Sequence, residues 1–183
     1  MAHTNEVRFL QRHAPKAIQY STSVLEMGSK CGVNMMPWRT LFPSLIGTDI
    51  EGGEGVDIVH DFMQGPFPTQ YELVLCCSVL EHTHKPWIVA QHTAASVQSG
   101  GYLYLTTPWT WRQHNYPIDW WRFSVEALKT LFPGFAWIAE SYSTTEKGDF
   151  RSERSHEVWV STIKEKKVNV VLTELSHLLG RKL

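Results

Sequence analysis

The run Val24-Leu25-Glu26-Met27-Gly28-Ser29-Lys30-Cys31-Gly32 decides the fold. A short apolar stretch leads directly into a turn with two glycines, which is typical of a buried strand that turns into a helix. Glycines in such a turn permit positive φ and let a ligand approach the backbone closely. We therefore interpret this run as the first strand of an α/β sheet, followed by a candidate ligand-binding turn.

Three later segments repeat this pattern, each placing an acidic or small polar residue after a β-branched or leucine-rich run. In chain order they are Ile46-Gly47-Thr48-Asp49-Ile50, Val56-Asp57-Ile58-Val59-His60-Asp61-Phe62 and Glu72-Leu73-Val74-Leu75-Cys76-Cys77-Ser78-Val79-Leu80-Glu81-His82. In open α/β sheets ligands bind at the carboxyl ends of the strands. We therefore expect the polar residues of all four segments to converge on one crevice.

The remaining pattern predicts helices that alternate with strands, then a late pair of strands and a final helix. The predicted elements are a leading helix over 1–20 interrupted at Pro15, helices over 33–42 and 86–97, a strand over 102–106, an aromatic loop over 109–123, a helix capped by Ser124 that runs to 131, strands over 135–142 and 157–163, and a terminal helix over 168–180. The fold class is therefore α/β, a single domain over 1–183 with a three-layer, mostly parallel sheet and a late antiparallel strand pair at one edge.

Composition excludes some classes of function. The 183 residues carry a net charge of -1, which argues against a protein that binds duplex nucleic acid. The three cysteines fit neither a disulfide framework nor a metal site, so we expect reduced thiols in a cytoplasmic protein. The N-terminus has no signal-peptide core and no apolar run approaches the roughly 20 residues of a membrane span, so we expect no membrane association.

The acidic residues that follow the strands suit a nucleoside ligand. A carboxylate at Asp49 can accept hydrogen bonds from two adjacent ribose hydroxyls, although a helix cap or a turn would also use it. Asp61 can accept from an adenine amino group while the Phe62 amide donates to the ring. An Asp-initiated turn toward Gly65 is the alternative interpretation. Glu26 beside the first turn would attract an ammonium group and repel a phosphate.

Together with Ser99-Gly100-Gly101-Tyr102-Leu103-Tyr104-Leu105-Thr106-Thr107-Pro108, these segments resemble the class I S-adenosylmethionine-dependent methyltransferases. Among these the sequence is most similar to the small type 11 methyltransferase-domain proteins. The shared pattern is acid-x-Gly at the first turn, acids after strands two and three, Leu-Glu-His after strand four and a glycine turn before strand five. Two residues depart from it, because Lys30 stands at a position that is normally glycine and Ser99 replaces the usual proline lead-in.

The resemblance implies a Rossmann-like methyltransferase fold, S-adenosylmethionine as the cofactor and S-adenosylhomocysteine as its product. The first turn would contact the methionine part, with Lys30 either reshaping the loop or placing a cation near the cofactor carboxylate. The implied cofactor-binding residues are Glu26, Gly28, Ser29, Lys30 and Gly32 for the methionine part, Asp49 and Ile50 for the ribose, Asp61 and Phe62 for the adenine, and Ser78 and Leu80 at the sulfonium end.

The aromatic loop after strand five is similar to a His-x-x-Pro-x-Asp-x-x-Arg-Phe stretch of the same group, which implies acceptor recognition. The candidate substrate residues are Trp109, Tyr116, Trp120 and Arg122, and the alternative is a lid of Trp120, Trp121 and Phe123 above an internal Asp119–Arg122 ion pair. His114 is the first candidate for a general base, followed by Asp119 and His82. We expect no metal, because His82-x-His84 is the only close histidine pair and Glu81 its only carboxylate companion.

We therefore predict methyl transfer to an oxygen or nitrogen atom of a small-molecule or glycan-like acceptor, by a monomer or homodimer. One alternative is a module that binds the cofactor without catalysis. Another is a nucleotide-dependent oxidoreductase, which the absent third glycine of the dinucleotide fingerprint disfavours. Methylation of protein or single-stranded nucleic acid is disfavoured by low basicity, although the tryptophans could stack bases.

Overall fold

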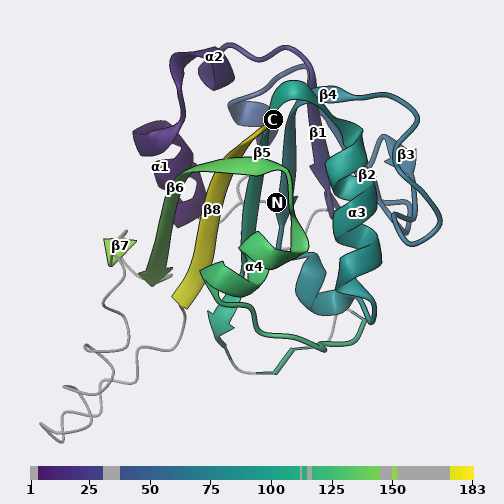
Figure 1. The fold of residues 1–183 in the computed structure, drawn as a ribbon. Coiled ribbons are helices and arrows are strands. Elements are labelled where there is room, and N and C mark those ends of the chain that lie inside the picture. Colours follow the sequence, from purple (N-terminus) through teal and green to yellow (C-terminus); the bar gives the residue numbers. More distant parts are fainter. Residues whose placement is uncertain (1–3, 31–37, 112, 115–116, 145–149, 152–173) are drawn as a thin grey trace, which may run out of the picture.

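The computed structural model describes residues 4–30, 38–111, 113–114, 117–144, 150–151 and 174–183 (Figure 1). These residues form one eight-stranded sheet with the strand order β3-β2-β1-β4-β5-β8-β6-β7. The strands are β1 (Val24–Met27), β2 (Ile46–Asp49), β3 (Ile58–Val59), β4 (Tyr71–Cys77), β5 (Val97–Thr110), β6 (Phe135–Thr144), β7 (Phe150–Arg151) and β8 (Glu174–Lys182).

Strands β1 to β5 are parallel, and β1 lies at the centre of this half of the sheet. Leu25 of β1 pairs with Ile46 of β2 on one side and with Val74 of β4 on the other. Because these five strands point the same way, their carboxyl ends lie at one edge, which we call the carboxyl edge. The predicted convergence of the polar segments at this edge follows from this topology.

Helices cover both faces of the sheet (Figure 1). The helical elements are α1 (Thr4–His13), α2 (Lys16–Gln19), the 3-10 turns η1 (Trp38–Thr40) and η2 (Leu80–His82), α3 (Pro86–Ser96) and α4 (Val125–Leu131). Two hydrophobic clusters separate the layers, since Leu25 and Val74 pack with residues of α3 and α4 while Val24 and Leu73 pack with residues of α1 and η1. Neighbouring strand residues thus face opposite layers, which confirms the predicted three-layer α/β fold.

The late antiparallel strands are present, but the predicted terminal helix is wrong. Residues 174–182 form β8, which is inserted between β5 and β6 and is antiparallel to both. A strand in the interior of a sheet is covered on both faces and shows no alternation. All residues from Leu175 to Gly180 are accordingly buried, and their leucines mimic a helical stripe. Residues 168–173 and the predicted strand over 157–163 lie outside the described part of the chain.

Several other predictions are confirmed. The leading helix breaks at Pro15 into α1 and α2, and α3 begins at Pro86 as expected. The Ser124 side chain caps α4 by accepting a hydrogen bond from the Ala127 amide at 3.1 Å. Of the predicted helix over 33–42, residues 38–40 form η1 and residues 33–37 are not among those described. None of the helices in the described residues is long and apolar enough to span a bilayer.

Candidate active site at the carboxyl edge

The turn after β1 contacts the segments that follow β2 and β4. Gly28 has a φ of 71°, and a Cβ there would lie 2.7 Å from Cγ2 of Val79, so the glycine permits close contact between the two turns. The Ser29 amide donates to the carbonyl of Thr48 at 3.0 Å. Three segments that are distant in sequence are therefore joined at one place.

Asp49 is held at the carboxyl edge by backbone amides. One carboxylate oxygen accepts from the Lys30 amide at 3.2 Å, and the other accepts from the Glu51 amide at 3.3 Å. The Asp49 side chain is thereby oriented. Since each carboxylate oxygen can accept more than one hydrogen bond, capacity remains for a ligand.

The Lys30 side chain turns away from the glycine turn. Its Nζ lies 2.7 Å from Glu51 Oε2 in an exposed ion pair, and its methylenes lie beside Gly53. The Lys30 cation is therefore directed to solvent and paired with Glu51. Ile50 is likewise exposed, and Gly32 lies outside the described residues.

Glu26, at the end of β1, is only 4% exposed. Burial raises the pKa of its carboxyl above the ordinary value of 4.5. A buried carboxylate next to a ligand turn suits a cationic ligand group, because a nearby positive charge would favour its ionised form.

Asp61 forms the Asp-initiated turn that was the alternative interpretation. Its Oδ1 accepts from the Met63 amide at 2.8 Å, and its carbonyl accepts from the Gln64 amide at 2.9 Å. Phe62 beside it is buried in the core. The His60 amide donates to the Asp49 carbonyl at 2.9 Å, so this turn also lies next to the end of β2.

Ser78 directly follows β4 and has a φ of 54°. Among the described residues it is the only one other than glycine with a positive φ. Such a conformation costs on the order of 1 kcal/mol and is most common at functional sites. The Ser78 amide donates to the carbonyl of Thr106 at 2.9 Å, which fixes the turn against β5. Leu80 is fully buried and packs in the core beneath this turn.

Glu81, His82 and His114 form a cluster at the same edge. One carboxylate oxygen and one ring nitrogen from each histidine all lie within 4.8 Å of one another. The two imidazole rings meet edge to face with centroids 4.8 Å apart. The sequence pairs Glu81 with His82 and offers His114 as a candidate base, but it gives no local signal that the three meet, because His114 reaches the others only when the aromatic loop folds back onto η2.

The Glu81 carboxyl is completely buried, and neither oxygen has a hydrogen-bond partner of good geometry among the described residues. Burial raises its pKa to about 8. Burial also lowers the pKa of His82, which keeps that imidazole neutral near pH 7. The cluster therefore places two imidazole rings beside a carboxyl group that has no hydrogen-bond partner among the described residues.

The predicted internal ion pair between Asp119 and Arg122 is present. Both carboxylate oxygens of Asp119 accept from the guanidinium, one of them from Nη2 at 2.7 Å, and the Asp119 side chain is 1% exposed. These bonds hold the pKa of Asp119 well below its usual range, so it remains ionised and is a poor proton acceptor. It also accepts from the His114 amide at 2.8 Å, which positions that residue.

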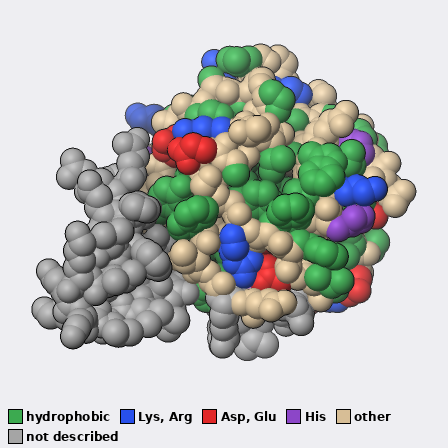
Figure 2. Space-filling model, turned by 60° about the horizontal axis from the view of Figure 1, so that its bottom comes forward, with side chains coloured by type: hydrophobic (Ala, Val, Ile, Leu, Met, Phe, Trp, Pro, Cys, Tyr) green, Lys and Arg blue, Asp and Glu red, His purple; other side chains and the backbone are tan. Residues whose placement is uncertain are grey.

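The aromatic loop is tied to η2 by hydrogen bonds. The Trp120 amide donates to the Glu81 carbonyl at 2.8 Å, and the Trp121 indole donates to the Thr83 carbonyl at 2.8 Å. The Trp120 side chain remains 52% exposed. Trp109 is half-buried against Tyr142, whereas Tyr116 lies outside the described residues. Figure 2, which brings the lower end of Figure 1 forward, shows hydrophobic side chains gathered on this face beside histidine and charged groups.

Helix α1 contributes a buried acid that sequence reasoning missed. Glu6 is fully buried, and its carboxylate accepts a hydrogen bond from the Thr106 hydroxyl near the end of β5. Asn5 beside it is buried with both side-chain amide atoms lacking partners among the described residues. The sequence could not show this contact, because a polar residue on a short helix is normally solvent-exposed.

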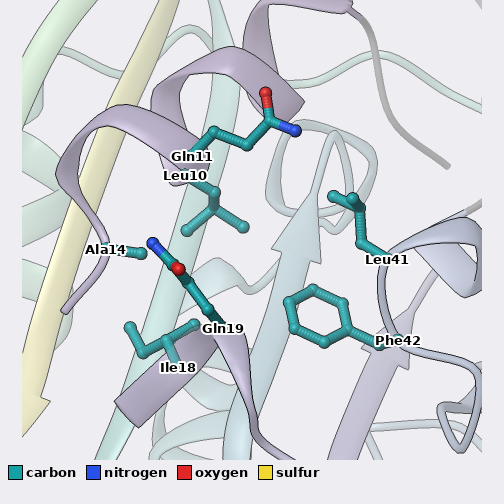
Figure 3. A pocket seen from close by; sticks show the side chains of 7 residues that line it. All are labelled: Leu10, Gln11, Ala14, Ile18, Gln19, Leu41 and Phe42. Atoms are coloured by element: carbon teal, nitrogen blue, oxygen red, sulfur yellow. The ribbon is translucent and has the colours of Figure 1, made fainter. Parts of the chain in front are cut away.

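A cavity of ≈ 200 Å³ lies away from these residues (Figure 3). Its lining residues are Leu10, Gln11, Ala14, Ile18, Gln19, Leu41 and Phe42. Ile18 and Gln19 precede β1, and Leu41 and Phe42 precede β2, so the cavity lies at the amino ends of these strands. It includes none of the residues predicted to act on a ligand.

Comparisons with known proteins also indicate a methyltransferase. A family model for methyltransferase domains, Methyltransf_23, matches residues 3–140. The chain belongs to this methyltransferase family. The match confirms the predicted class I methyltransferase with S-adenosylmethionine as its cofactor, and the narrower type 11 grouping remains a resemblance of sequence. No curated protein sequence gives a significant match.

Solved structures share the methyltransferase's fold at low sequence identity. The N-methyltransferase NodS from Bradyrhizobium japonicum, in complex with S-adenosylhomocysteine, is 13% identical with a TM-score of 0.61, over 98% of this chain and 85% of NodS. An S-adenosylmethionine-dependent methyltransferase from Archaeoglobus fulgidus is 15% identical with a TM-score of 0.60, over 97% of this chain and 92% of that one. The [4+2]-cyclase SpnF is 14% identical with a TM-score of 0.60, over 97% of this chain and 79% of SpnF.

Proposed function

We propose that this methyltransferase transfers the methyl group to an oxygen or nitrogen atom of a small-molecule or glycan-like acceptor at the carboxyl edge. The observation that carries the proposal is the Glu81–His82–His114 cluster, in which Glu81 and His82 follow β4 and the strained Ser78, and His114 follows β5. It supplies groups that can accept a proton next to the place where the family resemblance implies the sulfonium end of the cofactor.

The residues of the carboxyl edge fit the cofactor. Asp49, oriented by two amides, has acceptor capacity for the ribose hydroxyls, and buried Glu26 suits the ammonium group. Gly28 lets the turn after β1 pack against Val79, which holds it beside the segment that follows β4. When bound, S-adenosylmethionine supplies an electrophilic methyl group on a positively charged sulfur. The remaining proposed contacts are Ser29, Lys30, Gly32, Ile50, Asp61, Phe62, Ser78 and Leu80.

His114 is the proposed proton acceptor for the attacking group. Its Nδ1 lies 3.0 Å from Asp119 Oδ2, and its amide donates to the same carboxylate, so Asp119 positions it. A base in this position would remove the proton as the acceptor atom bonds to the methyl carbon. The rest of the rate acceleration would come from alignment of the acceptor with the methyl group and from exclusion of water by the aromatic loop.

The acceptor is proposed to lie against the aromatic loop. Trp120 is exposed beside the cluster, and Trp109 lies at the end of β5. Exposed tryptophan faces suit the apolar faces of a sugar ring or another small molecule, and they attract the sulfonium charge. Arg122 is engaged by Asp119 and by the Trp111 carbonyl at 3.2 Å, which supports a role in shaping the loop.

A cofactor-binding module without methyl transfer is the second candidate. The SpnF likeness supports considering it, because a [4+2]-cyclase shares this fold. The two candidates differ in one measurable product, since only the transferase releases S-adenosylhomocysteine in proportion to acceptor.

The test is release of S-adenosylhomocysteine with a panel of sugars, phenols and amines, with His114→Ala as the variant. We expect turnover to fall by about 100-fold, as for loss of a general base, while the Kd for the cofactor stays within about twofold. His84→Gln, which changes an exposed histidine, is the matched control and should leave turnover unchanged. Unchanged turnover in His114→Ala would remove His114 from the mechanism, and no release with any acceptor would contradict methyl transfer.

A further inference from the structure

The Glu81–His82–His114 cluster has the composition of a metal site. Two imidazoles and one carboxylate come from two segments, η2 and the aromatic loop, and their donor atoms lie within 4.8 Å. Ligands about 2.1 Å from one ion lie roughly 3 to 3.5 Å apart. A movement of about 1 Å, within the reach of side-chain rotation, would bring the three groups onto one ion.

The hydrogen bond of His82 leaves one nitrogen available as a ligand. His82 Nδ1 lies 3.0 Å from the Ile118 carbonyl oxygen, which can only accept, so the proton resides on Nδ1. The other nitrogen, Nε2, is therefore unprotonated in the neutral ring, and it lies 3.7 Å from Glu81 Oε1. A backbone carbonyl behind a metal-binding histidine is a common arrangement that fixes the ring and its tautomer.

A carboxylate stands behind the second histidine. Asp119 Oδ2 lies 3.0 Å from His114 Nδ1, without the alignment of a hydrogen bond in this structure, and Arg122 holds Asp119 in place. Carboxylate–histidine pairs of this kind orient metal ligands and strengthen them as donors. Because Arg122 balances the charge of Asp119, Glu81 is the group in the cluster left to balance a cation.

Glu81 provides the independent indication of a ligand. It is wholly buried, and neither of its oxygens has a hydrogen-bond partner among the described residues. Burial of a carboxylate without a partner is strongly unfavourable, and such groups are normally paired or bound to metal. Arg122 donates hydrogen bonds to Asp119 and to the Trp111 and Trp121 carbonyls, and neither Glu81 oxygen accepts one from it.

We propose that Glu81, His82 and His114 together bind one divalent first-row transition-metal ion, and that this ion binds the oxygen atom of a hydroxyl acceptor. Two imidazoles with one carboxylate favour ions such as Zn²⁺, Mn²⁺ or Fe²⁺ over Mg²⁺. Three protein ligands leave coordination positions open for a substrate. The acceptor part of this inference rests on the proposed methyl transfer, and it narrows the acceptor from any oxygen or nitrogen nucleophile to a hydroxyl.

The ion would change how the acceptor is activated. A hydroxyl bound to the ion loses its proton to solvent more readily, and the oxygen then forms a bond to the methyl carbon. The carbon–sulfur bond breaks, and its electron pair stays on the sulfur, which becomes neutral. His114 serves as a ligand in this form, and the ion takes over the activation for which a free His114 would act as base.

Calorimetric titration of chelator-treated protein with Mn²⁺ and with Zn²⁺, without cofactor or acceptor, tests the site. We expect one ion per chain, with affinity reduced at least tenfold in each of Glu81→Gln, His82→Ala and His114→Ala. The control His84→Gln should bind within twofold of the unaltered protein. No binding, or equal binding by all variants, would overturn the site. If Glu81→Gln does not fold, His114→Ala decides, since its imidazole is partly exposed and carries little risk for folding.

A second measurement separates this inference from the proposed function. Release of S-adenosylhomocysteine is followed with hydroxyl acceptors before and after chelation, and again after Mn²⁺ is restored. Loss and recovery of at least tenfold in rate supports acceptor activation by the ion. Turnover that is unchanged by chelation would overturn acceptor activation by the ion, while methyl transfer would stand. Metal binding without any release from hydroxyl or amine acceptors would overturn methyl transfer while the site stands.

Discussion

The two ends of the carboxyl edge are built differently. In the loops that follow β1 and β2, the charged groups Lys30, Asp49 and Glu51 are partly or fully exposed, and their bonds are to nearby backbone amides or to one another, whereas Glu26 within β1 is buried. At the end of β4 and β5, the acidic groups Glu81 and Asp119 are buried, and the aromatic loop closes over them.

This difference fits the two tasks that the proposed function assigns to the carboxyl edge. A cofactor that must enter and leave is best bound by groups that are already oriented and still in contact with water. A reaction that moves charge benefits from buried groups whose positions are fixed in advance. The stability of the protein should therefore be sensitive to charge changes at Asp119 and Arg122 and insensitive to charge changes at the exposed Lys30–Glu51 pair.

The largest expected effect comes from breaking the buried ion pair. Arg122→Met leaves the Asp119 carboxylate buried without its guanidinium, and we expect the free energy of unfolding to fall by about 3 kcal/mol. Urea denaturation followed by circular dichroism measures it. Glu51→Gln breaks an exposed pair at the other end and should cause no measurable change. Equal losses in both variants would contradict the contrast between the two ends.

A smaller effect is expected where the two ends touch, at Gly28 and Val79. Gly28→Ala combines a strained φ with a contact of 2.7 Å, and we expect a loss of about 2 kcal/mol in the free energy of unfolding. Gly134→Ala is the matched control, because it has a φ of 90° and open space around it, and should lose about 1 kcal/mol. Adding Val79→Ala to Gly28→Ala should remove the clash and so bring the loss in the free energy of unfolding back to that of Gly134→Ala. Without such coupling the two turns would not be in contact.

The smallest effect concerns pH at the β1 end. Burial raises the pKa of Glu26, so its carboxyl takes up a proton at a higher pH than an exposed glutamate. Since the ionised form would attract the cofactor's ammonium group, the affinity for S-adenosylmethionine should fall as the pH is lowered through this raised pKa. In Glu26→Gln the affinity should be weaker and independent of pH over that range. Calorimetry at a series of pH values measures both, and identical pH profiles would exclude this role for Glu26.

The parallel half of the sheet was predictable because its signals are local. Short apolar runs that end in glycine or acid, as at Gly28 and Asp49, fix both the strand and the polar group at its end. The cap at Ser124 and the helix start at Pro86 are equally local, and both are confirmed.

What failed depends on contacts between distant segments. The leucines of β8 have helical spacing, and only insertion between β5 and β6 makes that segment a strand. In the same way, the approach of His114 to Glu81 needs the aromatic loop to fold back onto η2. The expectation of no metal stays a prediction; it was drawn from close pairs in sequence, which do not include His114 of that loop.

The most direct test of the cofactor site is calorimetric titration with S-adenosylmethionine of the unaltered protein, Asp49→Asn and Gln11→Ala. We predict one molecule bound per chain, about tenfold weaker binding in Asp49→Asn because a charge-assisted contact is lost, and unchanged binding in Gln11→Ala, which alters the cavity at the opposite edge. Binding that is absent in the unaltered protein, or equal in Asp49→Asn, would contradict the site.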